Sequence, residues 1–462
     1  MADYQLAVIG SGPGGYVAAL RAADLGLKVC VIEEKGLGGT CLTVGCIPAK
    51  AMIRSAEVFH LAAHAADFGI RTAAPTVDWP ALMARKDRVV ALLQRGIQGL
   101  FKKRGIDLVA GRGRLLGPDR IQVTDAQGGG RQVHAEKVIV ASGSLPVEVP
   151  ALPFDGRRVL TSDDVTRLDR MPASILVIGG GYVGCQFACF FAELGVKAAV
   201  VEMLDHLLTD MDADLAKFAL RTLKRHKVEV RLGTRIESLD SRDGGVAAVP
   251  DKGTAMEADV ALVSVGRRCQ SAQMGLEEVG MEVDGHGAIL IDERCRTNVE
   301  NVYAVGDVTG RIMLAHVASR QGIVAAEDAA GRPHARIDYG KVPAAVFLHP
   351  ELATVGMTEA EARERRQRGK VVSVPQQILG RDQAEGEPGG FVKIVGDEST
   401  GEILGVHIAG HRASDLIHEA ALGLTAELLV EDLAATIHAH PTFSEGLMET
   451  AEAWLDRAIH AG

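Results

Sequence analysis

Two cysteines, Cys41 and Cys46, stand in a segment whose composition favours redox chemistry. The segment reads Gly38-Gly39-Thr40-Cys41-Leu42-Thr43-Val44-Gly45-Cys46-Ile47-Pro48-Ala49-Lys50. Pro48 suits the first position of a helix running through Ala56, so Cys46 is expected at a helix N-terminus, where the dipole stabilises a thiolate. Gly45 lets the chain bend so that the sulfurs meet. We predict a redox pair rather than two buried thiols beside a turn, because Lys50 follows one helical turn later and a nucleotide-binding pattern precedes.

A second candidate for proton chemistry lies near the C-terminus, in Ile437-His438-Ala439-His440-Pro441-Thr442-Phe443-Ser444-Glu445. Thiol–disulfide exchange needs a group that takes a proton from an incoming dithiol, and histidine suits this near neutral pH. Two structural interpretations compete. A histidine before a proline can be only a turn residue, and Thr442 with Glu445 also has the spacing of a capping box. His438 is expected to be structural.

The elements that would position these residues follow one pattern twice: strand, glycine-rich turn, helix, second strand and acid. Twenty-three residues separate Gly10 from Glu33, and twenty-three also separate Gly179 from Glu202. The glycines permit a close approach to a pyrophosphate, and the acid accepts ribose hydroxyls. One glycine fingerprint is weak evidence, but two complete copies predict two nucleotides, a flavin (FAD) and a nicotinamide. The predicted contacts are Gly10, Gly12, Gly14, Gly15 and Glu33 in the first copy, and Gly179, Gly181, Tyr182, Val183 and Glu202 in the second.

The second copy also indicates which nicotinamide is used. Glu202 would repel a 2′-phosphate, and the residues that follow it, Met203, Leu204 and Asp205, offer no arginine to hold one. NAD is therefore expected rather than NADP.

These motifs together resemble the pyridine nucleotide–disulfide oxidoreductases, and the lipoamide dehydrogenase branch especially. The resemblance extends from residue 5 to about residue 455. It implies that Cys41 is the interchange thiol that reacts with the substrate. It also implies that Cys46 is the charge-transfer thiol against the flavin, and that Lys50 lies near the isoalloxazine ring.

The resemblance implies further cofactor contacts along the chain. For FAD these are Gly113, Ser142, Gly143, Asp307 and Ala315, and for NAD they are Ile236 and Gly266. Asp307 stands in Tyr303-Ala304-Val305-Gly306-Asp307, where the family binds the ribityl chain. Read alone, Asp307 could be only a turn residue at a strand end, but its place after two nucleotide units favours the flavin.

The resemblance implies an α/β fold of two Rossmann-like nucleotide-binding domains, for FAD and NAD, with a C-terminal α+β dimerisation domain. His440 becomes the base and Glu445 its orienting carboxylate. In this family the base reaches the disulfide of the other subunit, so a homodimer is implied. The expected domains are residues 1–147 (FAD, first segment), 148–269 (NAD), 270–340 (FAD, second segment) and 341–462 (interface).

The implied activity is FAD-dependent oxidation of dihydrolipoamide on a lipoylated carrier protein, with reduction of NAD. Glutathione-type reductases use NADPH, which Glu202 opposes. Mercuric and large thioredoxin reductases carry an extra C-terminal cysteine pair, whereas no cysteine follows Cys295 here. A flavoprotein that acts as a redox sensor or scaffold is the remaining alternative, and the intact cysteine pair and His440 argue against it.

The chain departs from the family pattern at a few positions. Thr43, Ala49 and Ser142 are mild replacements. Gln186 stands where the family has a glutamate that pairs with the active-site lysine. We expect Lys50 to lose its counter-charge, which would favour an electron-rich flavin and raise its reduction potential.

Composition excludes several other classes of function. The formal net charge of −10 argues against nucleic acid or an anionic membrane as the main partner. No apolar stretch approaches the ~20 residues of a membrane span, and no secretory signal is visible, so the cytoplasm is the expected compartment. Cys30, Cys185 and Cys189 are expected to be buried small hydrophobes, and no metal site is predicted.

Overall fold

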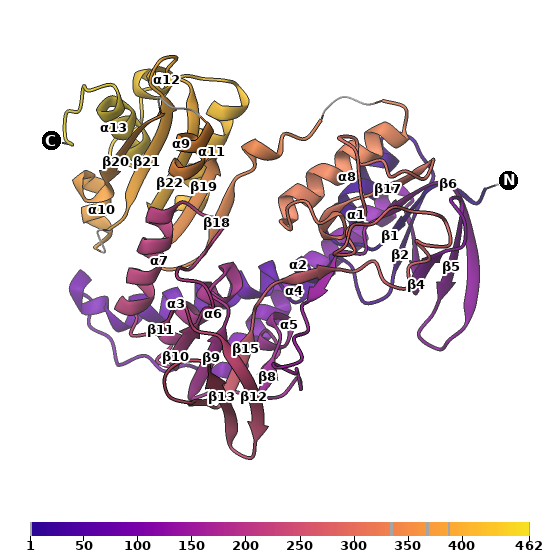
Figure 1. Ribbon diagram of the computed structural model, residues 1–462, viewed down its shortest axis with the longest axis horizontal. Helices are drawn as coiled ribbons and strands as arrows, with labels where there is room; N and C mark the ends of the chain where they lie inside the picture. Colours follow the sequence, from indigo (N-terminus) through magenta and orange to yellow (C-terminus); the bar gives the residue numbers. More distant parts are fainter. Residues whose placement is uncertain (1, 333–335, 366–368, 387–388, 462) are drawn as a thin grey trace.

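The computed structural model describes residues 2–332, 336–365, 369–386 and 389–461. Figure 1 shows three regions: two in which sheets and helices alternate, and a C-terminal region at the upper left. Every helix in the described ranges is too short or too polar to span a bilayer.

The first sheet is buried on both faces at its centre and partly exposed toward its edges. Its strands are β1 (Tyr4–Ile9), β2 (Val29–Glu33), β3 (Asp107–Ala110), β4 (Arg112–Leu115), β5 (Arg120–Thr124), β6 (Gly130–Val140) and β17 (Val302–Ala304). The last four residues of β1 are all buried, as expected for a parallel strand covered by helices. The parallel part has the order β3-β2-β1-β6-β17, so a segment that follows the second region completes the first sheet.

Helices of the first region pack closely where glycines permit it. They are α1 (Pro13–Asp24), α2 (Gly39–Thr43), α3 (Cys46–Ala63), α4 (Trp79–Arg104) and α8 (Ala315–Ala329). Helices α1 and α8 lie side by side (Figure 1). A Cβ on Gly322 would lie 2.3 Å from the carbonyl oxygen of Gly14, so a side chain at this contact would force the two helices apart.

The second region repeats this design. Its parallel sheet contains β8 (Val159–Leu160), β9 (Ser174–Ile178), β10 (Lys197–Val201), β11 (Glu229–Arg231) and β15 (Val260–Val263), with helices α5 (Ser162–Val165), α6 (Tyr182–Glu193) and α7 (Ala213–Arg225). The strand order is β11-β10-β9-β15-β8, and β9-α6-β10 corresponds to β1-α1-β2. A small antiparallel sheet joins β12 (Ile236–Arg242), β13 (Gly245–Pro250) and β14 (Met256–Ala258).

The third region is an antiparallel sheet with helices. The strands are β18 (Ala344–Val346), β19 (Glu351–Gly356), β20 (Gly369–Pro375), β21 (Phe391–Asp397) and β22 (Ile403–Gly410), in the order β18-β19-β22-β21-β20. The helices are α9 (Glu359–Arg365), α10 (Gly380–Glu385), α11 (Ala413–Thr425), α12 (Val430–Ala435) and α13 (Glu445–Trp454). The fold is thus the expected pair of Rossmann-like units followed by an α+β region.

The three regions share one apolar core. Met52 of α3, Phe190 of α6 and Leu348 before β19 belong to the same buried cluster, so each region contributes to it. The short strands β7 (Ser144–Pro146) and β16 (Arg267–Cys269) pair where the chain enters and leaves the second region. The domain boundaries after residues 147, 269 and 340 stay a prediction.

Candidate active site

The two cysteines lie where α2 ends and α3 begins. Cys41 is inside α2, and Cys46 is the first residue of α3, after its N-cap Gly45. Cys46 therefore has the predicted place at a helix N-terminus. The predicted bounds of the helix were wrong: it begins two residues before Pro48 and continues to Ala63 rather than Ala56. Proline fits anywhere in the first turn, because N–H groups there have no partner within the helix, so it does not mark the start.

Glycines bring the cysteine segment against the first glycine-rich turn. A Cβ on Gly45 would lie 2.9 Å from the carbonyl oxygen of Thr40, so the bend between the cysteines leaves no room for a side chain. A Cβ on Gly39 would lie 2.6 Å from the Cα atom of Gly12. The cysteines are thus held beside the N-terminus of α1.

The two sulfurs have different proton affinities. Both cysteines are thiols in this structure, with Cys41 half-buried and Cys46 exposed. The hydrogen bond from Cys41 has the largest effect on Cys46 and lowers its pKa to about 6; partial desolvation of the sulfur by neighbouring groups opposes this, and the charge of Lys50 assists it. The same hydrogen bond raises the pKa of Cys41. Cys46 therefore carries the thiolate at neutral pH.

Lys50 is held by neighbours from three regions. Its Nζ donates a hydrogen bond of 2.8 Å to Oε1 of Gln186 and lies 4.2 Å from the ring centroid of Phe347. Burial lowers the pKa of Lys50, while the charges of Cys46, Cys41 and Glu351 act to raise it. The predicted loss of a charged partner at Gln186 thus takes the form of a neutral hydrogen bond, and Glu351 supplies a nearby carboxylate.

The first glycine-rich turn has the geometry of a phosphate cradle. Gly10 has φ +101°, and a Cβ on it would lie 2.3 Å from the carbonyl oxygen of Ala141. Gly12 caps α1 without a side-chain hydrogen bond, so backbone N–H groups of the first turn are available to an anion. Glu33 accepts hydrogen bonds from the Ser11 N–H and hydroxyl, at 2.8 Å and 2.6 Å, which hold its carboxylate at the turn. These features fit the pyrophosphate and ribose of a dinucleotide.

The second glycine-rich turn has the same close backbone contacts and the same acid-to-backbone hydrogen bond as the first. Gly179 has φ +106°, and a Cβ on it would lie 2.4 Å from the carbonyl oxygen of Ser264. A Cβ on Gly184 would lie 2.0 Å from the oxygen of Gly179, as one on Gly15 would from Gly10. Glu202 accepts a 2.6 Å hydrogen bond from the N–H of Gly180, as Glu33 does from Ser11. The second unit therefore fits a dinucleotide equally well.

The remaining predicted contacts of the second unit lie at its edges. Gly181 caps α6 with open space around it, and Val183 in the first turn is 38% exposed. Burial raises the pKa of Tyr182 to about 12, so its phenol stays neutral. Gly266 has φ +119°. Ile236 is buried at the start of β12 and packs in an apolar cluster.

Asp307 is held by Ser144, which is in turn held by Arg267; neither residue was a predicted site residue. The Ser144 hydroxyl donates a 2.5 Å hydrogen bond to Oδ2 of Asp307 and accepts one of 2.7 Å from Nε of Arg267. Ser142 donates to the carbonyl oxygen of Gln270 at 2.7 Å. These contacts join the two segments of the first region to β16, and no local pattern could have revealed them.

Three further predicted FAD contacts lie on the same region. Gly113 is in β4, where a Cβ would lie 3.0 Å from the side chain of Ile9, so little space remains. Gly143 has φ +79°. Ala315 is the first residue of α8, whose N-cap Leu314 provides no side-chain hydrogen bond.

His440 and Glu445 form a hydrogen-bonded pair at the start of α13. Nδ1 of His440 lies 2.8 Å from Oε1 of Glu445, and the His440 side chain is 75% exposed. The capping box is only half formed, because Glu445 accepts from the N–H of Thr442 while the Thr442 hydroxyl donates to Ala439. Burial opposes ionisation of Glu445, but the N–H of Thr442 and His440 lower its pKa overall. His438 is bonded to Glu419 at 2.9 Å.

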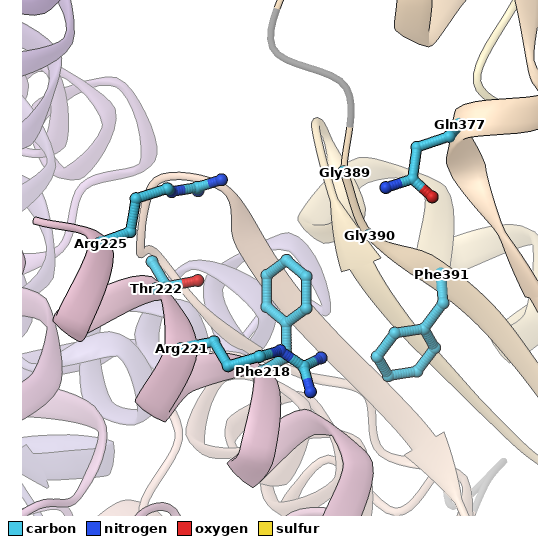
Figure 2. A pocket seen from close by; sticks show the side chains of 8 residues that line it. All are labelled: Phe218, Arg221, Thr222, Arg225, Gln377, Gly389, Gly390 and Phe391. Atoms are coloured by element: carbon cyan, nitrogen blue, oxygen red, sulfur yellow. The ribbon is translucent and has the colours of Figure 1, made fainter.

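The structure does not bring His440 to the cysteines of the same chain. Helix α13 lies in the C-terminal region, far from α2 in Figure 1. It packs on α12, β20 and β21. A cavity of about 380 Å³ between α7 and β21, lined by Phe218, Arg221 and Phe391 among others (Figure 2), includes none of the predicted site residues.

Known proteins resemble this chain over its whole length. Residues 4–322 match the family described as pyridine nucleotide-disulphide oxidoreductase, and residues 342–451 match its dimerisation domain. The chain is 41% identical to dihydrolipoyl dehydrogenase 1, mitochondrial, of Arabidopsis thaliana, over 99% of this chain and 92% of that one. It is 42% identical to the dihydrolipoyl dehydrogenase of Halobacterium salinarum, over 98% of this chain and 97% of that one.

A solved structure shows the same fold. LpdA of Mycobacterium tuberculosis superimposes with a TM-score of 0.91 at 31% identity, covering 97% of this chain and 99% of that one. Three findings agree: the sequence identity to full-length relatives, the matches to both domains of the family, and the geometry of the two dinucleotide turns. The chain belongs to the pyridine nucleotide-disulphide oxidoreductase family.

Proposed function

We propose that the protein oxidises dihydrolipoamide, carried on a lipoylated protein, to lipoamide and reduces NAD to NADH. The observation that carries the proposal is the cysteine pair: Cys41 and Cys46 meet at the start of α3, beside a dinucleotide turn. The names of full-length relatives at about 40% identity support this substrate. FAD and NAD(H) are the cofactors of this family.

The geometry of the two turns supports a proposed set of cofactor residues. Gly10, Gly12 and Glu33 would hold FAD together with Asp307, and Gly179 and Glu202 would hold NAD. When bound, FAD supplies two-electron chemistry between a dithiol and a nicotinamide. The protein's own task is to keep the cysteines, Lys50 and the nicotinamide turn in fixed relative positions.

The thiol chemistry follows from the cysteines and the histidine. Glu445 accepts the Nδ1–H of His440, which leaves Nε2 with a lone pair for a proton from the substrate thiol. The substrate thiolate attacks Sγ of Cys41 in the Cys41–Cys46 disulfide, and Cys46 leaves as a thiolate. The second substrate sulfur then attacks the first, and lipoamide is released as Cys41 takes up the proton. The lowered pKa of Cys46 supports its role as leaving group.

We infer that the working unit is a homodimer in which His440 of one subunit serves the cysteines of the other. The family's dimerisation domain matches residues 342–451. This range contains both His440 and Glu445, the first residue of α13. The distance between α13 and α2 within one chain supports the same arrangement (Figure 1).

Turnover with defined substrates tests the proposal. The purified protein with bound FAD should form NADH from dihydrolipoamide and NAD. Arsenite, which bridges two neighbouring thiols, should inhibit it only after reduction. NADPH with glutathione disulfide should give no comparable rate. A protein that binds FAD but fails to form NADH would refute the proposed reaction and leave a sensor or scaffold role.

The choice between NAD and NADP is expected to depend on Glu202. Its carboxylate should repel a 2′-phosphate, so kcat/KM for NAD should exceed that for NADP by at least ~100-fold. Replacing Glu202→Ser together with Met203→Arg should reduce this ratio at least ~10-fold. Glu237→Ser, at an exposed acid on β12, is the matched control and should leave the ratio unchanged. If the two variants have the same ratio of kcat/KM for NAD to kcat/KM for NADP, Glu202 does not determine the choice of nicotinamide.

Gln186 is expected to influence the potential of the bound flavin through Lys50. In the present hydrogen bond, Lys50 has the uncharged amide of Gln186 as its partner. Gln186→Glu should therefore add a negative charge beside Nζ of Lys50. That charge should lower the reduction potential, on the order of tens of millivolts. Spectroelectrochemistry of the wild type and the variant measures the shift. An unchanged potential would mean that Glu351 already neutralises Lys50.

Three finer assignments remain proposals. The lipoyl-bearing carrier can be sought by pull-down with lipoylated domains. The domain boundaries can be sought by limited proteolysis. A cytoplasmic location is also proposed, although the plant relatives are named as mitochondrial.

A further inference from the structure

Three side chains outside the proposed reaction converge between α6 and the end of α7. Cys189 and Glu193 belong to α6, and His226 is the C-cap of α7. One sulfur, one carboxylate oxygen and one imidazole nitrogen from these residues all lie within 4.8 Å of one another. Thiolate, imidazole and carboxylate are the ligand types of zinc sites.

The fold explains why these residues meet. Cys189 and Glu193 are four residues apart, so they lie on one face of α6. That face packs in the shared apolar core, where Cys189 is 2% exposed and the Glu193 side chain 1%. The ring of His226 is 12% exposed, and its Nε2 lies 4.0 Å from Oε1 of Glu193. A helix face and a helix end from the same region thus form a small polar pocket in an apolar setting.

The segment before β19 orients these ligands. Nδ1 of His349 lies 2.7 Å from Oε1 of Glu193, and its carbonyl oxygen lies 3.0 Å from Nε2 of His226. Burial raises the pKa of Cys189, and the backbone N–H of His349, which donates to the sulfur, acts against that rise. In metal sites, hydrogen bonds from residues that do not themselves bind the metal fix the orientation of the ligands.

A path of histidines connects this pocket with the surface. The ring of His60, in α3, lies edge-on to His349 with centroids 5.0 Å apart. The exposed His64 follows, with its ring centroid 4.2 Å from that of His60. The imidazoles of His349, His60 and His64 thus lie in a row from the buried carboxylate to the exposed surface.

We propose that Cys189, Glu193 and His226 form a binding site for one zinc-class divalent cation. A thiolate and a carboxylate neutralise the double charge, and a water molecule takes the fourth position while His349 keeps its hydrogen bond to Glu193. Tetrahedral zinc has bonds of about 2.0–2.3 Å, so the ligands must move closer by small side-chain rotations. Binding releases the thiol proton of Cys189 to solvent, and His226 exchanges its hydrogen bond to the carbonyl oxygen for the metal.

The site would join the three regions of the subunit. The ligands come from the second region, while His349 and His60 come from the third and first regions. Cys189 lies one helical turn from Gln186, the partner of Lys50, so the cation would stiffen the helix that holds this lysine. The competing interpretation is a buried Glu193–His349 ion pair that needs no metal.

Zinc binding to the holoenzyme tests the proposal without any measurement of turnover. The protein should be untagged, dialysed against a chelator, and carry Cys41→Ser and Cys46→Ser so that the redox cysteines cannot compete. Isothermal titration with Zn²⁺ should give one ion per chain. Cys189→Ala, Glu193→Gln and His226→Gln should each weaken binding at least ~10-fold. Cys185→Ala, a fully buried thiol one turn away on α6, is the matched control and should bind zinc as the parent does.

Folding of each variant is checked by bound FAD and by thermal unfolding. Zinc should raise the unfolding midpoint of the parent and of Cys185→Ala, but not of the near-isosteric Glu193→Gln. If the parent takes up no zinc, or if Glu193→Gln and His226→Gln bind it as tightly as the parent, the site is an ion pair only and the proposal is overturned.

Discussion

Replacing Cys41 or Cys46 by serine is expected to reduce dihydrolipoamide-dependent NADH formation by at least ~10³-fold, because neither serine can form the disulfide. Both variants should fold and keep FAD, since Cys41 is half-buried, Cys46 is exposed, and serine is close to cysteine in size. Steady-state kinetics at saturating NAD measures the effect. Cys185→Ala, which removes a buried thiol of α6, should retain near wild-type turnover if it folds. Substantial turnover in either serine variant would show that the pair is not the redox centre.

The two variants should also differ in the pH dependence of their remaining thiol. In Cys41→Ser the serine hydroxyl can still donate to Cys46, so the lowered pKa should persist. Alkylation should then be fast above about pH 6 and slow below it, since a lowered pKa keeps the thiolate at neutral pH. In Cys46→Ser the strong hydrogen bond to a thiolate is absent, so alkylation of Cys41 should need a pH above ~8. The reverse order would exchange the proposed roles of the two sulfurs.

His440→Gln is expected to lower kcat with dihydrolipoamide by ~10²–10⁴-fold, because glutamine cannot take the thiol proton. The side chain is largely exposed, so stability and FAD content should change little. His438→Gln is the matched control, two residues away and bonded to Glu419, and should leave most of the turnover intact. A loss confined to His438→Gln would contradict the assignment of the base.

Mixed dimers test whether His440 acts on the other subunit. When Cys41→Ser and His440→Gln chains are co-expressed, about half of the dimers should contain one chain of each kind. If the base comes from the partner, every such dimer has one complete site, and about a quarter of wild-type activity should return. If the base served its own chain, no dimer would have a complete site. No recovery in dimers shown to be mixed would therefore refute the shared site.

Features that depend on short stretches of chain were predictable from the sequence. The glycines of both turns, the acids Glu33 and Glu202, and the cysteine pair depend mainly on steric limits of the nearby backbone and on hydrogen bonds within one strand–turn–helix unit. His440 and Glu445 are only five residues apart, so the turn that begins α13 is enough to bring them together. The helix beginning at Cys46 was misjudged by two residues because proline is compatible with any position of the first turn.

The surroundings of these residues were decided by the tertiary structure. Lys50 meets Gln186 and Phe347 only because three regions pack around one core. The same packing brings Ser144 to Asp307, and Arg267 to Ser144. It also brought His226 of α7 to Cys189 of α6, which was predicted to be a plain buried thiol. Such contacts join segments that have no shared period in the sequence, because which helix faces meet is set by the shape and burial of the whole fold.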